Sequence, residues 1–285
     1  MIHVNFELHT MEDGTVIEGA HVAALDGAKG CLVVWPCMGG DCRMYRVPAE
    51  AFAEKGWDIL FYNPRGHGRS QGSLAIATAG EDLKALMAHY GVSDLPRVAF
   101  GHSGGCSALL KAASSGMEFL AYFFAAPVLN SRRSLFYMYK EKTIREFVYV
   151  TSRLAADPDL YQALLSDTHW LDESYWHSAN LREVLNGGSE AFPIGSFLEE
   201  LFIPGIDAMA DLAPREAQTT IFFPAHDNWY PHDTTREESG EELTTILMPE
   251  ATDHYFSCGW HGVWDQVLER LPQDAPLGDE APCTP

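Results

Sequence analysis

The sequence predicts an α/β fold, in which a mostly parallel sheet is covered by helices on both faces and is preceded by an antiparallel hairpin. Three observations predict it. Near the N-terminus, residues 2–9 and 15–25 alternate apolar and polar positions around an Asp-Gly turn. Short apolar runs then alternate with helical patterns as far as residue 125. After a helical stretch, the strand pattern resumes at residue 219.

The first 130 residues supply the hairpin and the first strand–helix units. Residues 31–35 (CLVVW) form an unbroken apolar run, which suits a strand buried on both faces. Helix-forming sequence follows from about residue 45 to 55 and stops at Gly56, because glycine favours the end of a helix. The later elements are a strand at 58–62, a helix at about 76–90, a strand at 98–100, a helix after Ser103 and a strand at 119–125.

Residues 131–212 break this alternation with amphipathic helical patterns and no convincing strand. One pattern runs from Leu135 to Leu154, another starts at Asp157-Pro158, and a third fades at residues 186–188. Residues 213–285 return to the core pattern. They predict strands at 219–223 and 243–248, a helix at about 260–271, and a disordered Pro-rich acidic tail from about residue 272.

Length and charge limit the classes of function. The 285 residues suit one sizeable domain, or a domain with an insertion. The net charge of −21 disfavours nucleic acid and anionic membrane surfaces as partners. The N-terminus has no basic region followed by an apolar run, and no segment approaches a membrane span, so we expect a cytoplasmic protein without stable membrane insertion. The sequence leaves open whether the chain forms a homodimer.

The six cysteines show no spacing typical of a metal site. Cys31 falls in a predicted buried strand and Cys106 on the helix after Ser103, which favours reduced core thiols. Whether Cys37 and Cys42 form a disulfide stays open. We expect neither a metal nor a cofactor.

The candidate nucleophile is Ser103. Residues 97–113 (RVAFGHSGGCSALLKAA) join an apolar strand to a helix through a G-x-S-x-G turn. Such a turn strains the serine backbone, so its neighbours must be nearly free of side chain, and Gly101 and Gly105 meet that need. The alternative is a glycine-rich strand-to-helix turn that holds an ordinary serine.

The acid and the base are predicted to follow the serine along the chain, each after a later strand. A short loop after residues 219–223 carries Asp227, and the loop after residues 243–248 carries His254 just before the last helix. A base must take the serine proton, and a carboxylate must hold that base in one tautomer. Rival acids and bases are Asp233, Asp253, His226, His232 and His261.

The rivals are less suited to these roles. Asp233 lies further from its strand, Asp253 directly adjoins His254 in the chain, and His261 falls inside a predicted helix. We therefore expect Ser103, His254 and Asp227 to be the catalytic residues.

An acyl-transfer intermediate also needs backbone N–H donors for its oxyanion. We expect one donor at Gly104, directly after the nucleophile, and the other at Met38 in the PCMGG loop after residues 31–35, with Cys37 as the alternative. The glycines behind Met38 would let the backbone turn inward.

These motifs resemble the α/β-hydrolase superfamily, near the lysophospholipase-like and monoacylglycerol-lipase-like serine hydrolases of the serine aminopeptidase S33 type. The matching pieces are DGT (13–15), PCMGG (36–40), NPRGHGRSQG (63–72), GHSGG (101–105) and DHYF (253–256). Two departures are Pro36-Cys37 in place of His-Gly, and Asn63 in place of the usual Asp.

The resemblance covers the core before residue 131 and after residue 212. It implies an α/β-hydrolase fold in which residues 131–212 form a helical cap that sets substrate choice, and it implies that residues 65–70 buttress the site, with His67 structural. The cap region is rich in aromatic residues, and some of them are expected to line an apolar pocket.

Together these observations predict a serine esterase that cleaves a carboxylic ester of a hydrophobic or uncharged small molecule through an acyl-enzyme. Thioesterase, C–C bond hydrolase, amidase and acyltransferase activities are alternatives on the same residues, because a fold does not fix the reaction. A non-catalytic ligand-binding protein is the alternative from another class, and such proteins typically lose a residue of the triad.

Overall fold

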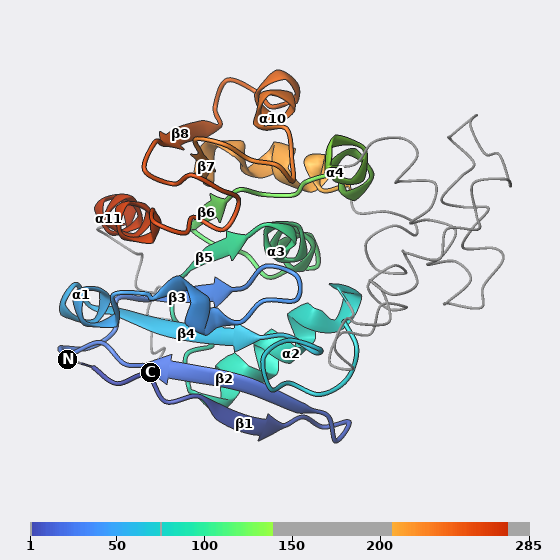
Figure 1. The fold of residues 1–285 in the computed structure, drawn as a ribbon. Helices are drawn as coiled ribbons and strands as arrows, with labels where there is room; N and C mark the ends of the chain where they lie inside the picture. The colour runs from blue at the N-terminus through green and yellow to red at the C-terminus, as the bar shows by residue number, and fades with distance from the viewer. Residues whose placement is uncertain (1, 75, 139–206, 273–285) are drawn as a thin grey trace, which may run out of the picture.

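A computed structural model describes residues 2–74, 76–138 and 207–272, which are built around an eight-stranded sheet (Figure 1). The strands lie in the order β1-β2-β4-β3-β5-β6-β7-β8. β2 pairs antiparallel with β1 and β4, and every other pairing is parallel. The strands are β1 (Glu7–Thr10), β2 (Val16–Val22), β3 (Gly30–Trp35), β4 (Trp57–Asn63), β5 (Arg97–His102), β6 (Ala121–Ala125), β7 (Thr219–Pro224) and β8 (Thr244–Met248). The predicted fold class is confirmed.

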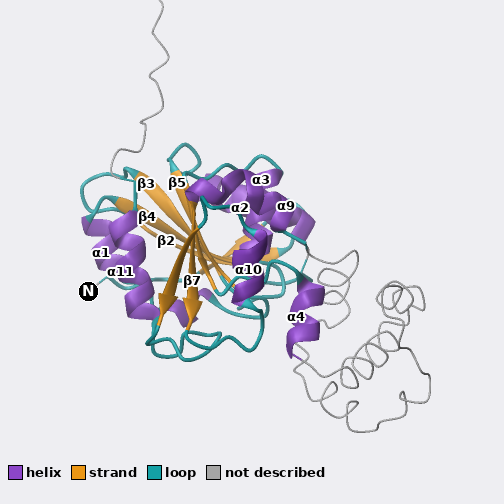
Figure 2. Ribbon diagram, turned by 90° about the horizontal axis from the view of Figure 1, so that it is seen from above, coloured by secondary structure: helices purple, strands orange, loops and turns teal. Residues whose placement is uncertain are grey.

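Helices cover both faces of this sheet (Figure 2). The α-helices are α1 (Ala49–Glu54), α2 (Ile76–His89), α3 (Gly104–Ser114), α4 (Ser131–Met138), α9 (Met209–Leu212), α10 (His232–Glu238) and α11 (Trp260–Arg270), and the 3₁₀ turns are η1 (Cys42–Tyr45) and η3 (Ala213–Gln218). Residues of α2 and α3 pack on one face, and residues of α1 and α11 pack on the other. Strand β5 shows why: Ala99 points to the first layer, whereas Val98 and Phe100 point to the second.

The helix predicted from about residue 45 to 55 is wrong in its first part. A 3₁₀ turn, Cys42–Tyr45, ends where the helix was predicted to start, and α1 begins only at Ala49. Arg46 adopts a left-handed backbone (φ 47°), which ends the turn, and Pro48 precedes the helix because proline cannot donate inside one. Helix α10 lies in a polar segment for which the sequence predicted no helix.

The predicted insertion lies mostly outside the described residues. Of residues 131–212, the structure describes 131–138 and 207–212. Asp207 forms an isolated antiparallel β-bridge with Asn130, which directly precedes the first of these ranges. The helices predicted beyond Met138, and the tail from residue 273 on, are not among the described residues. Within the described parts, none of the helices is long and apolar enough to cross a membrane.

The parallel strands determine where the functional loops meet. The carboxyl ends of β3, β5, β7 and β8 lie at the same edge of the sheet because these strands run in parallel. The loops that leave those ends carry the segments singled out above: residues 36–41, Ser103, residues 225–231 and residues 249–259. This edge is where ligands bind in open α/β sheets.

Candidate active site

Ser103 occupies the sharp turn between β5 and α3. Its backbone has φ 57° and ψ −128°, a conformation that a residue with a side chain rarely adopts. A Cβ on Gly105 would lie 2.2 Å from the carbonyl oxygen of Pro36, and one on Gly101 would lie 2.9 Å from Leu109 Cδ1. Both positions flanking the serine therefore require glycine.

His254 reaches Ser103 from the loop after β8. Its Nε2 lies 2.8 Å from Ser103 Oγ. The imidazole is buried, with 2% of its surface exposed. The loop is tied to the neighbouring one because Ala225 N–H donates to the carbonyl oxygen of Ala251 at 2.7 Å.

Asp227 lies on the other side of the same ring. Its Oδ1 and Oδ2 are each 3.1 Å from His254 Nδ1. The backbone N–H groups of Trp229 and Tyr230 also donate to Oδ1, at 2.7 and 3.2 Å, and hold the carboxylate in place. Since a carboxylate only accepts, Nδ1 carries the proton and Nε2 is left to accept from the serine hydroxyl.

The rival acids Asp253 and Asp233 have partners other than the His254 ring. Asp253 accepts from Tyr255 N–H, Ser257 N–H and the Ser257 hydroxyl, so it stabilises the turn that follows it. Against the opposing effect of burial, these donors lower the pKa of its carboxyl. Asp233 pairs with His232 on α10 at 3.0 Å and is exposed.

The rival histidines His226 and His261 are exposed, unlike the buried His254. His261 lies in the first turn of α11. Ser103, His254 and Asp227 are thus the members of the predicted set that the structure brings into mutual contact.

The two expected oxyanion donors adjoin each other. A Cβ on Gly104, the first residue of α3, would lie 2.6 Å from Met38 Cγ. Among the described residues, the backbone N–H groups of Met38 and Gly104 have no hydrogen-bond acceptor, whereas Cys37 N–H donates to the Tyr45 hydroxyl at 2.7 Å. The alternative donor Cys37 is therefore occupied. Cys37 and Cys42 are both free thiols.

His67 holds the loop that carries Met38 through a hydrogen bond to Gly39. Its Nδ1–H donates to the carbonyl oxygen of Arg65 at 3.0 Å, and its Nε2 accepts from Gly39 N–H at 2.9 Å. Burial lowers the pKa of this imidazole, which keeps it in the neutral form that can accept from Gly39. His67 therefore contacts the backbone of the loop and not the serine.

A buried chain of hydrogen bonds links the Cys37 loop to the His254 loop. The Tyr45 hydroxyl accepts from Cys37 N–H and lies 3.2 Å from His102 Nδ1, and His102 Nε2 lies 2.9 Å from the carbonyl oxygen of His254. Burial lowers the pKa of His102 to about 3, so the ring is neutral and donates through Nε2–H to that carbonyl. Neither Tyr45 nor His102 was predicted from the sequence to take part in the site.

Asn63, where the resemblance leads one to expect Asp, also has a structural reason. Its amide donates to Glu18 Oε2 at 2.8 Å, and its oxygen accepts from Cys42 N–H at 2.9 Å. Glu18 is fully buried and also accepts from Arg43 and Arg69. An Asp at position 63 would place a second carboxylate beside it. The Asn therefore suits this cluster.

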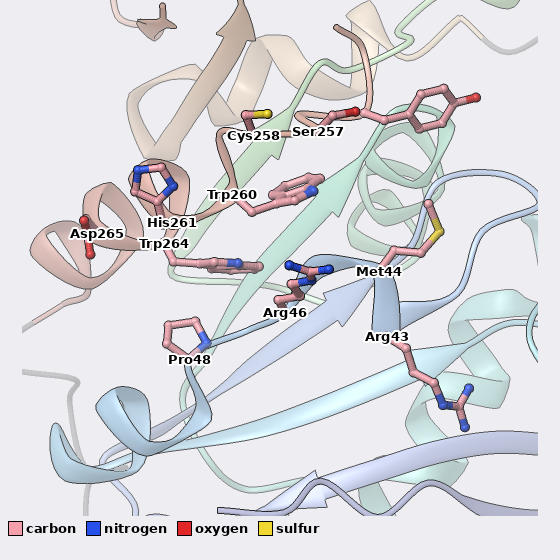
Figure 3. A pocket seen from close by; sticks show the side chains of 11 residues that line it. Arg43, Met44, Arg46, Pro48, Ser257, Cys258, Trp260, His261, Trp264 and Asp265 are labelled. Atoms are coloured by element: carbon pink, nitrogen blue, oxygen red, sulfur yellow. The ribbon is translucent and has the colours of Figure 1, made fainter. Parts of the chain in front are cut away.

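A cavity of about 860 Å³ lies between the segment around Arg46 and the start of α11 (Figure 3). Tyr255, Trp260 and Trp264 are among its lining residues, whereas Ser103, His254 and Asp227 are not. No group of three or more potential metal ligands occurs among the residues that the structure describes.

A family model described as serine aminopeptidase, S33, matches residues 26–184. No curated protein matches the sequence.

Solved structures show the same fold at low sequence identity. A proline iminopeptidase-related protein from Thermus thermophilus is 18% identical with a TM-score of 0.62, covering 97% of this chain and 100% of that one. Carboxylesterases of Nitrososphaera gargenis are represented by a structure with 16% identity, a TM-score of 0.59, and coverage of 92% and 97%. A soluble variant of monoglyceride lipase from Saccharomyces cerevisiae, in complex with a substrate analogue, is 14% identical with a TM-score of 0.58, covering 94% of this chain and 94% of that one.

Proposed function

Because the chain belongs to the serine aminopeptidase S33 family of α/β hydrolases, we propose that it is a serine hydrolase that cleaves carboxylic esters of hydrophobic or uncharged small molecules. The observation that carries the proposal is the pair of contacts at His254, with Ser103 Oγ at 2.8 Å and the Asp227 carboxylate at 3.1 Å. Carboxylesterase and monoglyceride lipase structures among the similar folds support the ester as the substrate class.

In the first step, Ser103 Oγ attacks the ester carbonyl while His254 Nε2 takes its proton. The charge that develops on the carbonyl oxygen is stabilised by the N–H groups of Met38 and Gly104. Each such donor lowers the activation barrier by about 2.7–4 kcal/mol. Asp227 stabilises the imidazolium and keeps Nδ1 protonated. The C–O bond to the alcohol then breaks, and the alcohol oxygen receives the proton from Nε2.

In the second step, water attacks the acyl-enzyme. His254 Nε2 takes a proton from the water, and the Ser103–acyl bond breaks when that proton is returned to Ser103 Oγ. The carboxylic acid leaves and the enzyme is restored. Every proton passes through one imidazole, which is why its tautomer must be held by Asp227.

The test is hydrolysis of a p-nitrophenyl ester series from acetate to laurate, measured beside an acyl-CoA thioester. We expect wild-type protein to hydrolyse an ester in this series, and the Ser103→Ala variant to lose at least about 10³-fold in kcat while keeping its thermal midpoint. A thioester cleaved in preference to all esters would change the substrate class, and folded wild-type protein without any hydrolysis would overturn the proposal.

A further inference from the structure

Two partly exposed aromatic rings surround the buried imidazole of His254. The Trp229 indole stacks on it, with ring centroids 5.3 Å apart and planes 21° apart. Tyr255 meets the imidazole edge-on at 5.4 Å and meets Trp229 edge-on at 5.9 Å. Trp229 is 36% exposed and Tyr255 40% exposed, whereas His254 is 2% exposed. The surface that a ligand meets beside the base is therefore aromatic.

Both backbone polar groups of Trp229 are hydrogen-bonded. Its N–H donates to Asp227 Oδ1 at 2.7 Å, and its carbonyl oxygen accepts from the Ser134 hydroxyl of α4 at 2.6 Å. The carboxylate that orients His254 thus also orients the segment that carries the indole. Such a rigid, partly exposed aromatic residue can contribute to binding at little cost in side-chain entropy.

The chemistry of the proposed function determines which part of the substrate meets this surface. His254 Nε2 must deliver its proton to the alcohol oxygen as the C–O bond breaks, so that oxygen departs within hydrogen-bond reach of Nε2. The remainder of the alcohol extends from that oxygen and passes the rings around the imidazole. The acyl half stays bonded to Ser103.

Resting on the proposed function, we infer that Trp229 and Tyr255 form the binding surface for the alcohol half of the ester, and that this half is an uncharged apolar or aromatic alcohol. The acidic groups beside the rings, Asp227 and Asp253, and the net charge of −21 disfavour an anionic alcohol. Aromatic rings on this surface favour flat apolar groups through stacking and edge contacts.

The test compares three butyrate esters that share one acyl group: benzyl butyrate, methyl butyrate and 4-carboxybenzyl butyrate. We expect wild-type protein to favour benzyl over methyl butyrate in kcat/KM, mainly through KM, and to disfavour the carboxybenzyl ester. Trp229→Leu should lower the benzyl-to-methyl ratio about tenfold, and Trp229→Phe should retain part of it because an aromatic ring remains. Trp57→Leu, a Trp change at the start of β4 and so at the edge of the sheet opposite the site, should leave the ratio unchanged.

A purely structural role of Trp229 would lower the rates for benzyl and methyl butyrate by the same factor, so an unchanged ratio in Trp229→Leu would overturn the inference. A wild-type preference for the carboxybenzyl ester would also overturn it. The p-nitrophenyl series separates the proposed function from the inference. If wild-type protein cleaves no ester of that series, the proposed function fails and the inference fails with it, whereas cleavage of p-nitrophenyl butyrate but not of benzyl butyrate overturns the inference alone.

Discussion

Removing the hydroxyl of Tyr45 tests the buried link between the Cys37 loop and the His254 loop. In Tyr45→Phe, Cys37 N–H loses its acceptor at 2.7 Å and His102 Nδ1 loses its donor at 3.2 Å. Cys37 is 4% exposed and His102 is 0% exposed, so neither group can turn to water in the folded state.

The magnitude follows from the number of groups left unpaired. Each unsatisfied buried polar group costs about 1–3 kcal/mol, so the two together should lower the free energy of unfolding by about 2–6 kcal/mol. For a chain of this size, that corresponds to a fall in the thermal midpoint of roughly 5–15 °C. The loosened Cys37 and His254 loops should also lower kcat for ester hydrolysis about tenfold, because small misplacements of catalytic groups are costly.

Calorimetry and p-nitrophenyl butyrate kinetics measure both effects. Tyr62→Phe is the matched control, since Tyr62 is also fully buried but its hydroxyl donates to the carbonyl oxygen of Ala79, away from the site. We expect that variant to lose about 1 kcal/mol and to keep its kcat. A Tyr45→Phe protein with an unchanged midpoint and unchanged kcat would refute the reasoning.

Three further changes have definite expected outcomes. Gly105→Ala places a Cβ 2.2 Å from the Pro36 oxygen and should lower kcat about 100-fold, because it displaces the loop expected to carry an oxyanion donor. Gly80→Ala, whose Cβ has its nearest contact at 3.4 Å, should keep the wild-type kcat. Equal kcat values in the two variants would count against an oxyanion role of the loop. Asn63→Asp should lower the midpoint in a thermal melt at neutral pH, because it sets a second carboxylate beside buried Glu18, and a midpoint at or above wild type would disprove this. Against the raising effect of burial, the bonds to Arg43, Arg69 and Asn63 lower the pKa of Glu18 to about 2, so its contribution to stability is complete above pH 4.5 and is lost as pH falls from there towards 2. Urea unfolding at pH 5 and pH 3 should therefore show a smaller drop in Glu18→Gln than in wild type, and an equal drop would contradict the assignment.

Much of the fold follows from local patterns in the sequence. Unbroken apolar runs such as residues 31–35 are strands buried on both faces, and the alternation with helices leads to the parallel sheet. The positions of Ser103, Asp227 and His254 were expected because each follows a strand in a sheet whose carboxyl ends share one edge. That order brings them to one edge of the sheet, where the hydrogen bonds of their loops hold them in contact.

The contacts that support these three residues could not be predicted from local sequence patterns. His102 bonds to the carbonyl oxygen of His254, 152 positions away, and that register is set only when β5 and the loop after β8 are packed together. Tyr45 reaches Cys37 through the 3₁₀ turn Cys42–Tyr45, which the sequence did not predict. Trp229 stacks on His254 through a turn closed by the Asp227 side chain. Each depends on tertiary geometry and leaves no local pattern.

The central claim is that His254 activates Ser103 for attack on a carbonyl. The most direct measurement is labelling of folded protein with a fluorophosphonate probe, followed by peptide mapping by mass spectrometry. We predict one adduct, on Ser103, which is lost in His254→Ala protein that retains its fold. Wild-type protein that stays unlabelled, or an adduct on Ser103 that forms at the same rate without His254, would contradict the claim.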